Sequence, residues 1–414
     1  MRRFLTPLIF LAGFLSVAPA RADFLIRDGD TVAFLGDSIT AARGYPKIVE
    51  LYTLMRYPER KVRFLNAGQG GDTAFGSLER LERDVFSKGA TVVTVAFGIN
   101  DIGWGTKANP ENRQKYLDGI RTIVTRCQER KVRPVICSAA ITAEAPDKAE
   151  KEYLQGMTDE GLALAKSLGA ETIDLQRGMR EIQRRIVDAN RREPDESKHS
   201  TLHAKDGVHL SDLGQLAMGF SMLKGLGAPP LVSSGTIDAA TMTLSGSEGC
   251  TITELQRKDD GLSFVRLDQG LPMNLGVLSG LNYRFIPVPE GLNQYRLTVS
   301  GLPEGKYEIT ACGRKMGEES AAALAKGVNM ASMTANGWEP GGLWNAQSDA
   351  VKELVDARDK LRAGGVIREK FAAPHPESAA LADESAKLDS RLTEHMRHLA
   401  RPVPYRIEIR KLKN

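Results

Sequence analysis

Cysteine and long apolar runs are scarce in this sequence, and each scarcity excludes a class of protein. Four cysteines in 414 residues are too few for a small disulfide-stapled scaffold, and no Cys-x-x-Cys pair occurs. No group of cysteine and histidine residues has the spacing of a zinc site, so we expect neither a metal nor another cofactor. After residue 22 no stretch is long and apolar enough to span a membrane, so we expect no integral membrane segment in the mature chain.

A large excess of charge of one sign is also missing. The formal net charge is +4, and Arg2, Arg3 and Arg21 all lie in the first 22 residues. Subtracting these three leaves +1, which gives no strongly basic surface for nucleic acid. We therefore expect no nucleic-acid partner.

Residues 1–22 have the three parts of a signal peptide. A positive start, MRR, is followed by the apolar stretch FLTPLIFLAGFLSV and by the small-residue region APARA, with Ala20 or Ala22 as the last residue removed. The apolar stretch is short and contains a proline, which disfavours the alternative of an uncleaved membrane anchor. The segment predicts export to the periplasm or the medium.

In an exported chain the four cysteines could form disulfides, and three pairings are possible. Cys127 and Cys137 fall on a predicted helix and the strand after it, where buried free thiols are as plausible as a bridge. Cys250 with Cys312 is a plausible bridge in the second half of the chain.

Strand-like and helix-like segments alternate from residue 31 to about residue 227. The strand-like runs are TVAFL, VRFLNA, TVVTVAF, RPVICSA and AETIDL, and helix-period stretches separate them. This alternation predicts an α/β domain over residues 24–227, with a parallel sheet and helices on both faces. In such sheets a ligand binds beyond the carboxyl ends of the strands.

The pattern changes near the Gly/Pro/Ser-rich stretch GLGAPPLVSSGT, residues 225–236. Short strand-like runs after it predict a second domain, residues 231–414, built as a small antiparallel β-module. Two polar helix-period segments are expected at about 345–370 and 376–400. The run YRIEIRKL then predicts a final strand that returns to the sheet of the module.

Polar clusters stand where the predicted strands of the first domain end. Ser38 follows the first strand in TVAFLGDSIT, Gly68 follows the second in NAGQGGDTA, and Asn100 follows the third in GIND. A fourth cluster, DGVHLSDLG, carries Asp206 and His209 just before a helix. We expect these loops to form one site.

These residue types suit acyl transfer. A serine hydroxyl needs an adjacent base, for which His209 is the candidate, and Asp206 could fix the tautomer of that imidazole. The Ser38 and Gly68 N–H groups and the Asn100 amide could supply three oxyanion donors. The neighbouring Asp37 and Asp101 are expected to orient these loops.

The four blocks, taken in order, resemble the SGNH/GDSL hydrolase family, whose marker residues are Ser, Gly, Asn and His in separate loops. The resemblance covers about residues 24–227, with Ile39 in place of the leucine of the GDSL motif. It implies a three-layer α/β/α sandwich with a parallel five-stranded, flavodoxin-like sheet. It places the family's catalytic and oxyanion roles on residues already singled out: Ser38, Asp206, His209, Gly68 and Asn100.

An exported serine esterase that removes small acyl groups, above all O-acetyl groups on carbohydrate, is the function we expect. No long apolar lid segment flanks the site, and an appended β-module is typical of carbohydrate-active esterases by analogy of architecture. A lysophospholipase or thioesterase of the same family is the enzymatic alternative, and a catalytically inactive carbohydrate- or partner-binding protein is the other. The partner would be a small-molecule or glycan ester; the sequence does not indicate an oligomeric state.

Several further residues have two interpretations. Trp104 could line an acyl or sugar subsite or simply pack its loop, and Arg43 could contact a polar substrate. The histidines outside the fourth cluster are expected at the surface: His199, His203, His375, His395 and His398. The β-module could be a purely structural cap packed on the catalytic domain, or it could bind sugar. The aromatics available for sugar binding are Tyr283, Phe285, Tyr295 and Tyr307. The stretch ANGWEPGGLWN, with Trp338 and Trp344, could fold over the active site.

Overall fold

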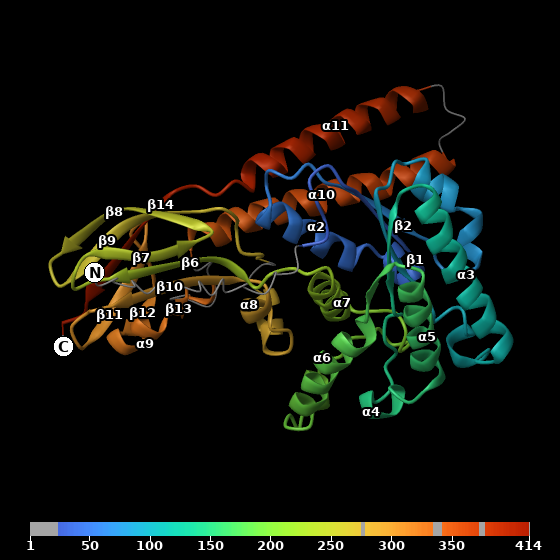
Figure 1. Cartoon of the computed structure of the whole chain (residues 1–414), viewed down its shortest axis with the longest axis horizontal. Coiled ribbons are helices and arrows are strands. Elements are labelled where there is room, and N and C mark those ends of the chain that lie inside the picture. The colour runs from blue at the N-terminus through green and yellow to red at the C-terminus, as the bar shows by residue number, and fades with distance from the viewer. Residues whose placement is uncertain (1–23, 275–277, 334–341, 372–376, 414) are drawn as a thin grey trace, which may run out of the picture.

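The computed structural model describes residues 24–274, 278–333, 342–371 and 377–413. The predicted signal peptide, His375 and Trp338 lie outside the described residues. In Figure 1 an α/β part and a β-rich part lie side by side, and two long C-terminal helices extend from the β-rich part along the α/β part.

A five-stranded parallel sheet forms the centre of the α/β part. Its strand order, β2-β1-β3-β4-β5, is the flavodoxin-like order. Every residue of β1 and of β3 is buried, because helices cover both faces of a parallel sheet. The five strands are β1 (Thr31–Gly36), β2 (Arg63–Gly68), β3 (Val92–Ala96), β4 (Arg133–Cys137) and β5 (Glu171–Ile173).

Helices cover the two faces of this sheet in two groups (Figure 1). Helix α7 packs against α2 and α6 on one face, and α3 packs against α5 on the other. This arrangement confirms the predicted three-layer α/β/α sandwich. The helices are α1 (Ser38–Ala41), α2 (Gly44–Arg56), α3 (Pro110–Glu129), α4 (Pro146–Ala149), α5 (Tyr153–Ser167), α6 (Leu175–Asn190) and α7 (Asp212–Gly225). Short 3-10 helices lie at Gly76–Glu79, Gly103–Gly105 and Glu196–Lys198, and one π-helical turn lies at Glu82–Phe86.

The β-rich part contains two sheets, with strand orders β13-β10-β6-β7 and β12-β11-β14-β9-β8. The final strand pairs with both β11 and β9, as the sequence predicts. One pair, β6 with β10, is parallel, so the expectation of a purely antiparallel module is wrong. The strands are β6 (Leu231–Asp238), β7 (Thr243–Glu248), β8 (Cys250–Lys258), β9 (Gly261–Asp268), β10 (Gln294–Ser300), β11 (Lys306–Ala311), β12 (Arg314–Ser320), β13 (Val328–Asn329) and β14 (Tyr405–Lys411). Short helices lie at Leu278–Arg284, α8 (Val288–Gly291), α9 (Ala321–Lys326) and Met330–Ser332.

Several aromatic residues to which the sequence assigns no single role pack in the core of the β-rich part. Tyr295 and Tyr405 pack against Trp344 with ring centroids 5.4 and 4.9 Å away, and Trp344 is 2% exposed. Trp344 therefore does not cover the active site. Tyr307 and Phe285 are buried as well, so these candidate side chains present no exposed aromatic face for sugar binding.

All four cysteines are free, and Cys127, Cys137 and Cys250 are buried. The expected bridge between Cys250 and Cys312 is wrong. Cys250 starts β8 and Cys312 follows β11, and these strands are three positions apart in the sheet. Three strand spacings of about 4.8 Å amount to about 14 Å, which is beyond the reach of a disulfide.

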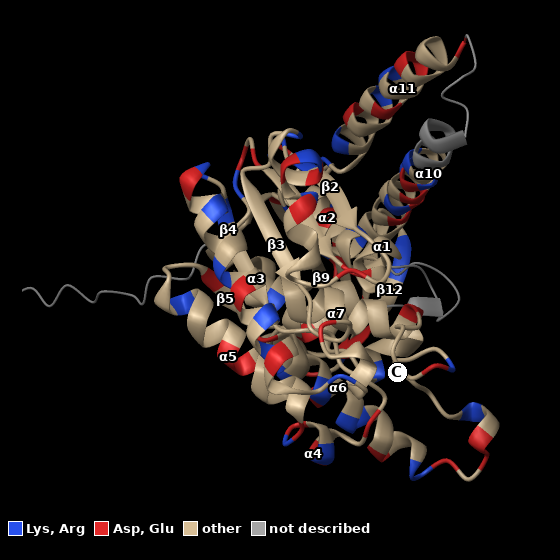
Figure 2. Ribbon diagram, turned by 90° about the vertical axis from the view of Figure 1, so that its right-hand side faces the viewer, with Lys and Arg blue, Asp and Glu red and all other residues tan. Residues whose placement is uncertain are grey.

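The C-terminal helices α10 (Leu343–Phe371) and α11 (Ser378–Leu399) form a hairpin that lies along α2 and the sheet edge. Figure 2 shows charged residues of both signs along both helices. Ion pairs hold α10 to the segment around α2: Arg43–Asp359 at 2.5 Å, Lys47–Asp356 at 2.9 Å and the buried pair Glu50–Arg358.

Candidate active site

Ser38 stands at the first position of α1, immediately after β1. The Asp37 side chain caps this short helix by accepting the Ile39 N–H at 2.9 Å. Gly36 allows the tight turn, because a Cβ there would lie 2.1 Å from the Thr40 hydroxyl. The sharp strand-to-helix turn thus holds the Ser38 hydroxyl at the carboxyl end of the sheet.

Ser38, His209 and Asp206 form a continuous chain of hydrogen bonds. His209 Nε2 lies 2.9 Å from Ser38 Oγ, and His209 Nδ1 lies 2.6 Å from Asp206 Oδ2. The second oxygen of Asp206 accepts the backbone N–H groups of Val208 and His209, each at 2.9 Å. The bonds from the Val208 N–H and the imidazole lower the pKa of Asp206 to about 2, so this carboxylate is charged at neutral pH.

His203 anchors the loop that carries this pair. Its ring Nε2 lies 2.9 Å from the carbonyl oxygen of Ile141. The His203 backbone also forms an isolated antiparallel β-bridge with Leu210, and the N–H of the next residue, Ala204, donates to the His209 carbonyl. Burial lowers the pKa of His203, so a neutral ring donates to the carbonyl. The expectation that His203 is a solvated histidine is therefore wrong; His199, His395 and His398 are exposed as expected.

Gly68 packs against α1, where an added Cβ would lie 2.2 Å from the Ala41 nitrogen. Its N–H, the predicted oxyanion donor, donates to Asn66 Oδ1 at 2.9 Å, and the Asn66 amide donates to the Thr40 carbonyl. Farther along this loop, an added Cβ on Gly70 would lie 4.0 Å from Ser38 Cβ, so Gly70 lies beside the proposed nucleophile. Within the described residues, the N–H groups of Ser38, Gly70 and Gly71 have no hydrogen-bond partner.

Asn100 is held between two neighbours. Its Nδ2 donates to the Asp72 carbonyl at 3.0 Å, and its Oδ1 accepts the Trp104 indole N–H at 2.9 Å. Because an indole can only donate, this contact fixes which end of the amide carries hydrogens. The Trp104 ring also lies edge-on to His209, with centroids 5.6 Å apart, and is 50% exposed. Trp104 thus borders the Ser38 site rather than packing its loop interior.

Arg80 is a buried residue of the site that the sequence does not reveal. Its guanidinium donates to Asp72 Oδ2 at 2.6 Å, to the Ala67 carbonyl at 2.6 Å and to the Gly36 carbonyl at 3.1 Å. One side chain therefore joins the loops after β1 and β2 to Asp72, whose own carbonyl holds Asn100. In the sequence Arg80 stands in a charged helical stretch, where nothing distinguishes it from solvent-exposed arginines.

Two further carboxyl groups lie beneath these loops. Burial raises the pKa of Asp101 to about 7 and that of Asp37 to about 6. Asp101 Oδ1 accepts the Ala74 N–H at 3.0 Å, which ties the loop after β2 to the loop after β3. Both carboxyls orient loops, as the sequence predicts.

The described ranges contain no group of three or more His, Cys, Asp or Glu residues arranged to hold a metal ion. In the same ranges no helix combines the length and apolar character needed to cross a membrane.

Two comparisons with known sequences bear on this domain: a match to a family and a match to one curated relative. Residues 34–217 match the GDSL-like Lipase/Acylhydrolase family. Over 131 residues the chain is 27% identical to the uncharacterized lipoprotein YqeF of Bacillus subtilis (strain 168); the match covers 30% of this chain and 54%, about half, of that relative.

Solved structures extend the comparison to the whole chain. The structure of BT4096, described as a gut microbial diltiazem-metabolizing enzyme, matches 95% of this chain and 100% of its own at a TM-score of 0.79 and 23% identity. Axe2, an acetylxylan esterase from Geobacillus stearothermophilus, matches 49% of this chain and 96% of its own at a TM-score of 0.41 and 20% identity. The first of these shows that the β-rich part belongs to a fold shared over nearly the full length. Residues 34–217 thus form a domain of the GDSL-like Lipase/Acylhydrolase family.

Proposed function

We propose that the chain is an exported serine esterase that hydrolyses small acyl esters, in particular O-acetyl groups on carbohydrate. The observation that carries the proposal is the unbroken hydrogen-bond chain from Ser38 Oγ through His209 to Asp206. A nucleophile in contact with a base, itself oriented by a carboxylate, is the arrangement that acyl transfer requires.

In this mechanism Ser38 Oγ attacks the ester carbonyl while His209 Nε2 takes its proton. Asp206, charged at neutral pH, stabilises the imidazolium that forms. When the tetrahedral intermediate collapses, His209 returns the proton to the departing alcohol oxygen and the acyl group stays on Ser38. A water molecule, deprotonated by His209, then attacks the acyl-enzyme. As the second tetrahedral intermediate collapses, His209 returns that proton to Ser38 Oγ and the acid leaves.

The oxyanion of each tetrahedral intermediate needs donors that are free and already in place. The Ser38 N–H and the second hydrogen of Asn100 Nδ2 meet this need. Gly68 can serve as the third donor only if its bond to Asn66 opens. We therefore propose that the N–H groups of the adjacent Gly70–Gly71 turn take that position.

The surroundings of Ser38 favour a small acyl group on a polar alcohol. The His209 and Asp206 side chains are each 38% exposed, which leaves the site open to solvent. Trp104 presents an exposed aromatic ring beside His209, and such a flat ring can stack on the face of a sugar.

Export and the domain limits belong to the same proposal. The composition of residues 1–22 and the lipoprotein description of the YqeF relative support export. We propose cleavage after Ala20 or Ala22, a hydrolase domain over residues 24–227 and a β-rich domain over residues 231–414.

Active-site labelling tests the enzyme proposal. A fluorophosphonate probe should label the native chain, and Ser38→Ala should abolish both labelling and hydrolysis of p-nitrophenyl acetate. Ser87→Ala, at an exposed serine whose hydroxyl bonds only the Arg83 carbonyl, is the matched control and should change neither. Native protein that is neither labelled nor active would overturn the proposal. An acyl-length series on p-nitrophenyl esters that favours octanoyl over acetyl would overturn the small-acyl part.

A further inference from the structure

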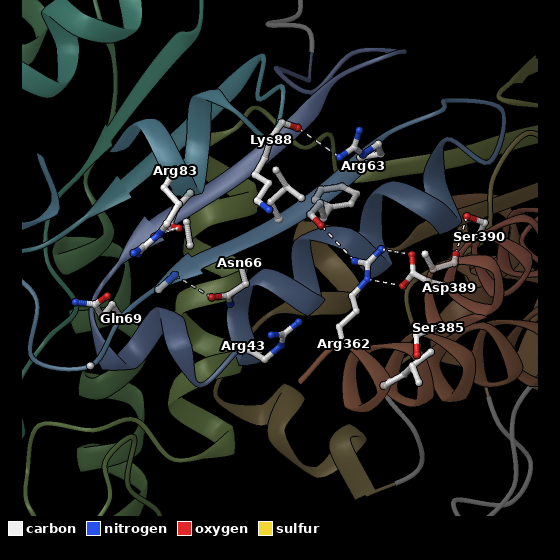
Figure 3. Close-up of a pocket in the computed structure, with 18 residues that line it drawn as sticks. Arg43, Arg63, Asn66, Gln69, Arg83, Lys88, Arg362, Ser385, Asp389 and Ser390 are labelled. Carbon is white, nitrogen blue, oxygen red and sulfur yellow. Dashed lines mark hydrogen bonds and ion pairs between the residues drawn. The ribbon is translucent and has the colours of Figure 1, made fainter. Parts of the chain in front are cut away.

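A groove of about 1160 Å³ runs between strand β2 and the α10–α11 hairpin (Figure 3). Strand β2 is the edge of the parallel sheet, so one of its sides has no strand partner. Arg362 of α10 spans the groove: it donates to the Phe64 carbonyl of β2 at 3.2 Å and forms a two-bond ion pair with Asp389 of α11. The hairpin and the hydrolase domain therefore build this groove together.

One end of the groove lies at the loop after β2, beside the proposed nucleophile, although Ser38 itself does not line the groove. Gly68, Gln69 and Gly70 line that end, and Gly70 is the residue whose added Cβ would lie 4.0 Å from Ser38 Cβ. The other end lies at Arg63 and Lys88. Five residue steps along β2 separate the two ends, about 16 Å at a rise of ~3.3 Å per residue. The groove is thus long enough for a chain of several units that starts at Ser38.

The charges of the groove are unbalanced at this far end. Three lining cations are paired with carboxylates: Arg43 with Asp359, Arg83 with Asp84, and Arg362 with Asp389. Arg63 and Lys88 are exposed, and neither has a carboxylate partner within the described residues. Two cations in one groove without counter-charges are the chemistry that binds an anion.

The wall between the two ends combines apolar side chains, among them Phe64, Leu65 and Leu361, with polar groups. Gln69 presents an amide, and Ser385 and Ser390 of α11 present hydroxyl groups that donate to carbonyls of their own helix and can still accept a hydrogen bond. A fatty acyl chain that entered this groove would contact the apolar side chains but would also cover these polar groups, which costs free energy where they lose water as a hydrogen-bond partner. A chain rich in hydroxyl groups can instead exchange hydrogen bonds with water for hydrogen bonds with the wall.

We propose that this groove binds the alcohol part of the ester, an oligosaccharide that carries carboxylate or sulfate groups. The esterified unit lies at Ser38 and an anionic unit lies several positions away at Arg63 and Lys88. This inference deepens the proposed esterase function and rests on it for the position of the ester. It gives the C-terminal hairpin a role in substrate selection.

Binding to the full chain by calorimetry tests the groove without any catalysis. Three unesterified probes are compared: tetragalacturonate, which carries carboxylates, a sulfated carrageenan tetrasaccharide, and neutral xylotetraose. We expect one or both anionic probes to bind about 2- to 30-fold more tightly than xylotetraose, which is the contribution of two partly exposed ion pairs. Which anionic probe binds identifies the anion.

The double variant Arg63→Gln/Lys88→Gln should remove this preference, and the charge reversal Arg63→Glu/Lys88→Glu should invert it. The matched control, Arg192→Gln/Lys326→Gln, changes two exposed cations outside the groove and should keep the preference. Thermal melts of all variants check that they fold. Equal binding of the three probes, a preference that survives both groove variants, or binding of lysophosphatidylglycerol micelles alone would overturn the inference.

Labelling of Ser38 by the fluorophosphonate in the same preparations separates the two proposals. Labelled protein without an anionic preference overturns the groove inference alone. Protein that binds the anionic probes but is neither labelled nor active overturns the esterase proposal and leaves the anionic groove supported.

Discussion

Replacing Arg80 with methionine should destabilise the hydrolase domain and slow its reaction together. The guanidinium is 5% exposed and holds Asp72, itself buried, along with the carbonyls of Ala67 and Gly36. Methionine has a similar length but no donor, so Asp72 would remain buried without its counter-charge. Removing one partner of a buried ion pair costs about 3–5 kcal/mol of the free energy of unfolding.

A loss of that size corresponds to a fall in Tm of roughly 6–20 °C for a domain of this length. Urea and thermal denaturation measure it, and p-nitrophenyl acetate kinetics measure the effect on kcat, because the backbone of Asp72 holds Asn100. The double variant Arg80→Met/Asp72→Asn removes the orphaned charge and should recover part of the stability lost in Arg80→Met. A loss below about 1 kcal/mol for Arg80→Met, or a double variant less stable than the single one, would refute this reasoning.

Three other perturbations address the site. Trp104→Phe keeps a ring beside His209 but removes the bond to Asn100, and kcat on p-nitrophenyl acetate should fall about 2- to 10-fold, the value of one hydrogen bond. Asp206→Asn cannot hold the same imidazole tautomer, and kcat should fall about 10²- to 10⁴-fold. Asp101 has a pKa of about 7 in the folded chain and 3.8 as its ordinary value, so the folded state binds the extra proton between about pH 4 and 7. Stability from this group therefore falls as pH rises through that window, and Asp101→Asn should reduce the slope of unfolding free energy against pH by up to about 1.4 kcal/mol per pH unit.

Each of these three has a result that would count against it. Unchanged kcat in Trp104→Phe would mean that the indole bond does not position Asn100. Asp206→Asn with more than half of the native kcat would remove Asp206 from the mechanism. A pH slope in Asp101→Asn equal to that of the native chain, measured by urea denaturation from pH 4 to 7, would contradict the proton uptake assigned to Asp101.

The sequence by itself determined the architecture of the first half of the chain. Alternating apolar strands and amphipathic helices dictate a covered parallel sheet, and they do so locally, because period and turn residues are properties of short segments. The same logic placed Ser38, Asn100 and the Asp206/His209 pair at strand ends or in one loop. These positions meet in space because the carboxyl ends of parallel strands share one edge of the sheet.

Only the tertiary structure decided which groups are engaged with one another. The bond from Gly68 to Asn66, the triple contact of Arg80 and the burial of His203 join residues whose sequence surroundings look ordinary. The same holds for Cys250 and Cys312, which strand order separates, and for Trp344, which fills a core. Hydrogen-bond partners and burial depend on how segments distant in the chain pack together, and a local sequence pattern does not predict that packing. The α10–α11 groove is the clearest case, since its two walls come from residues about 300 positions apart in the chain.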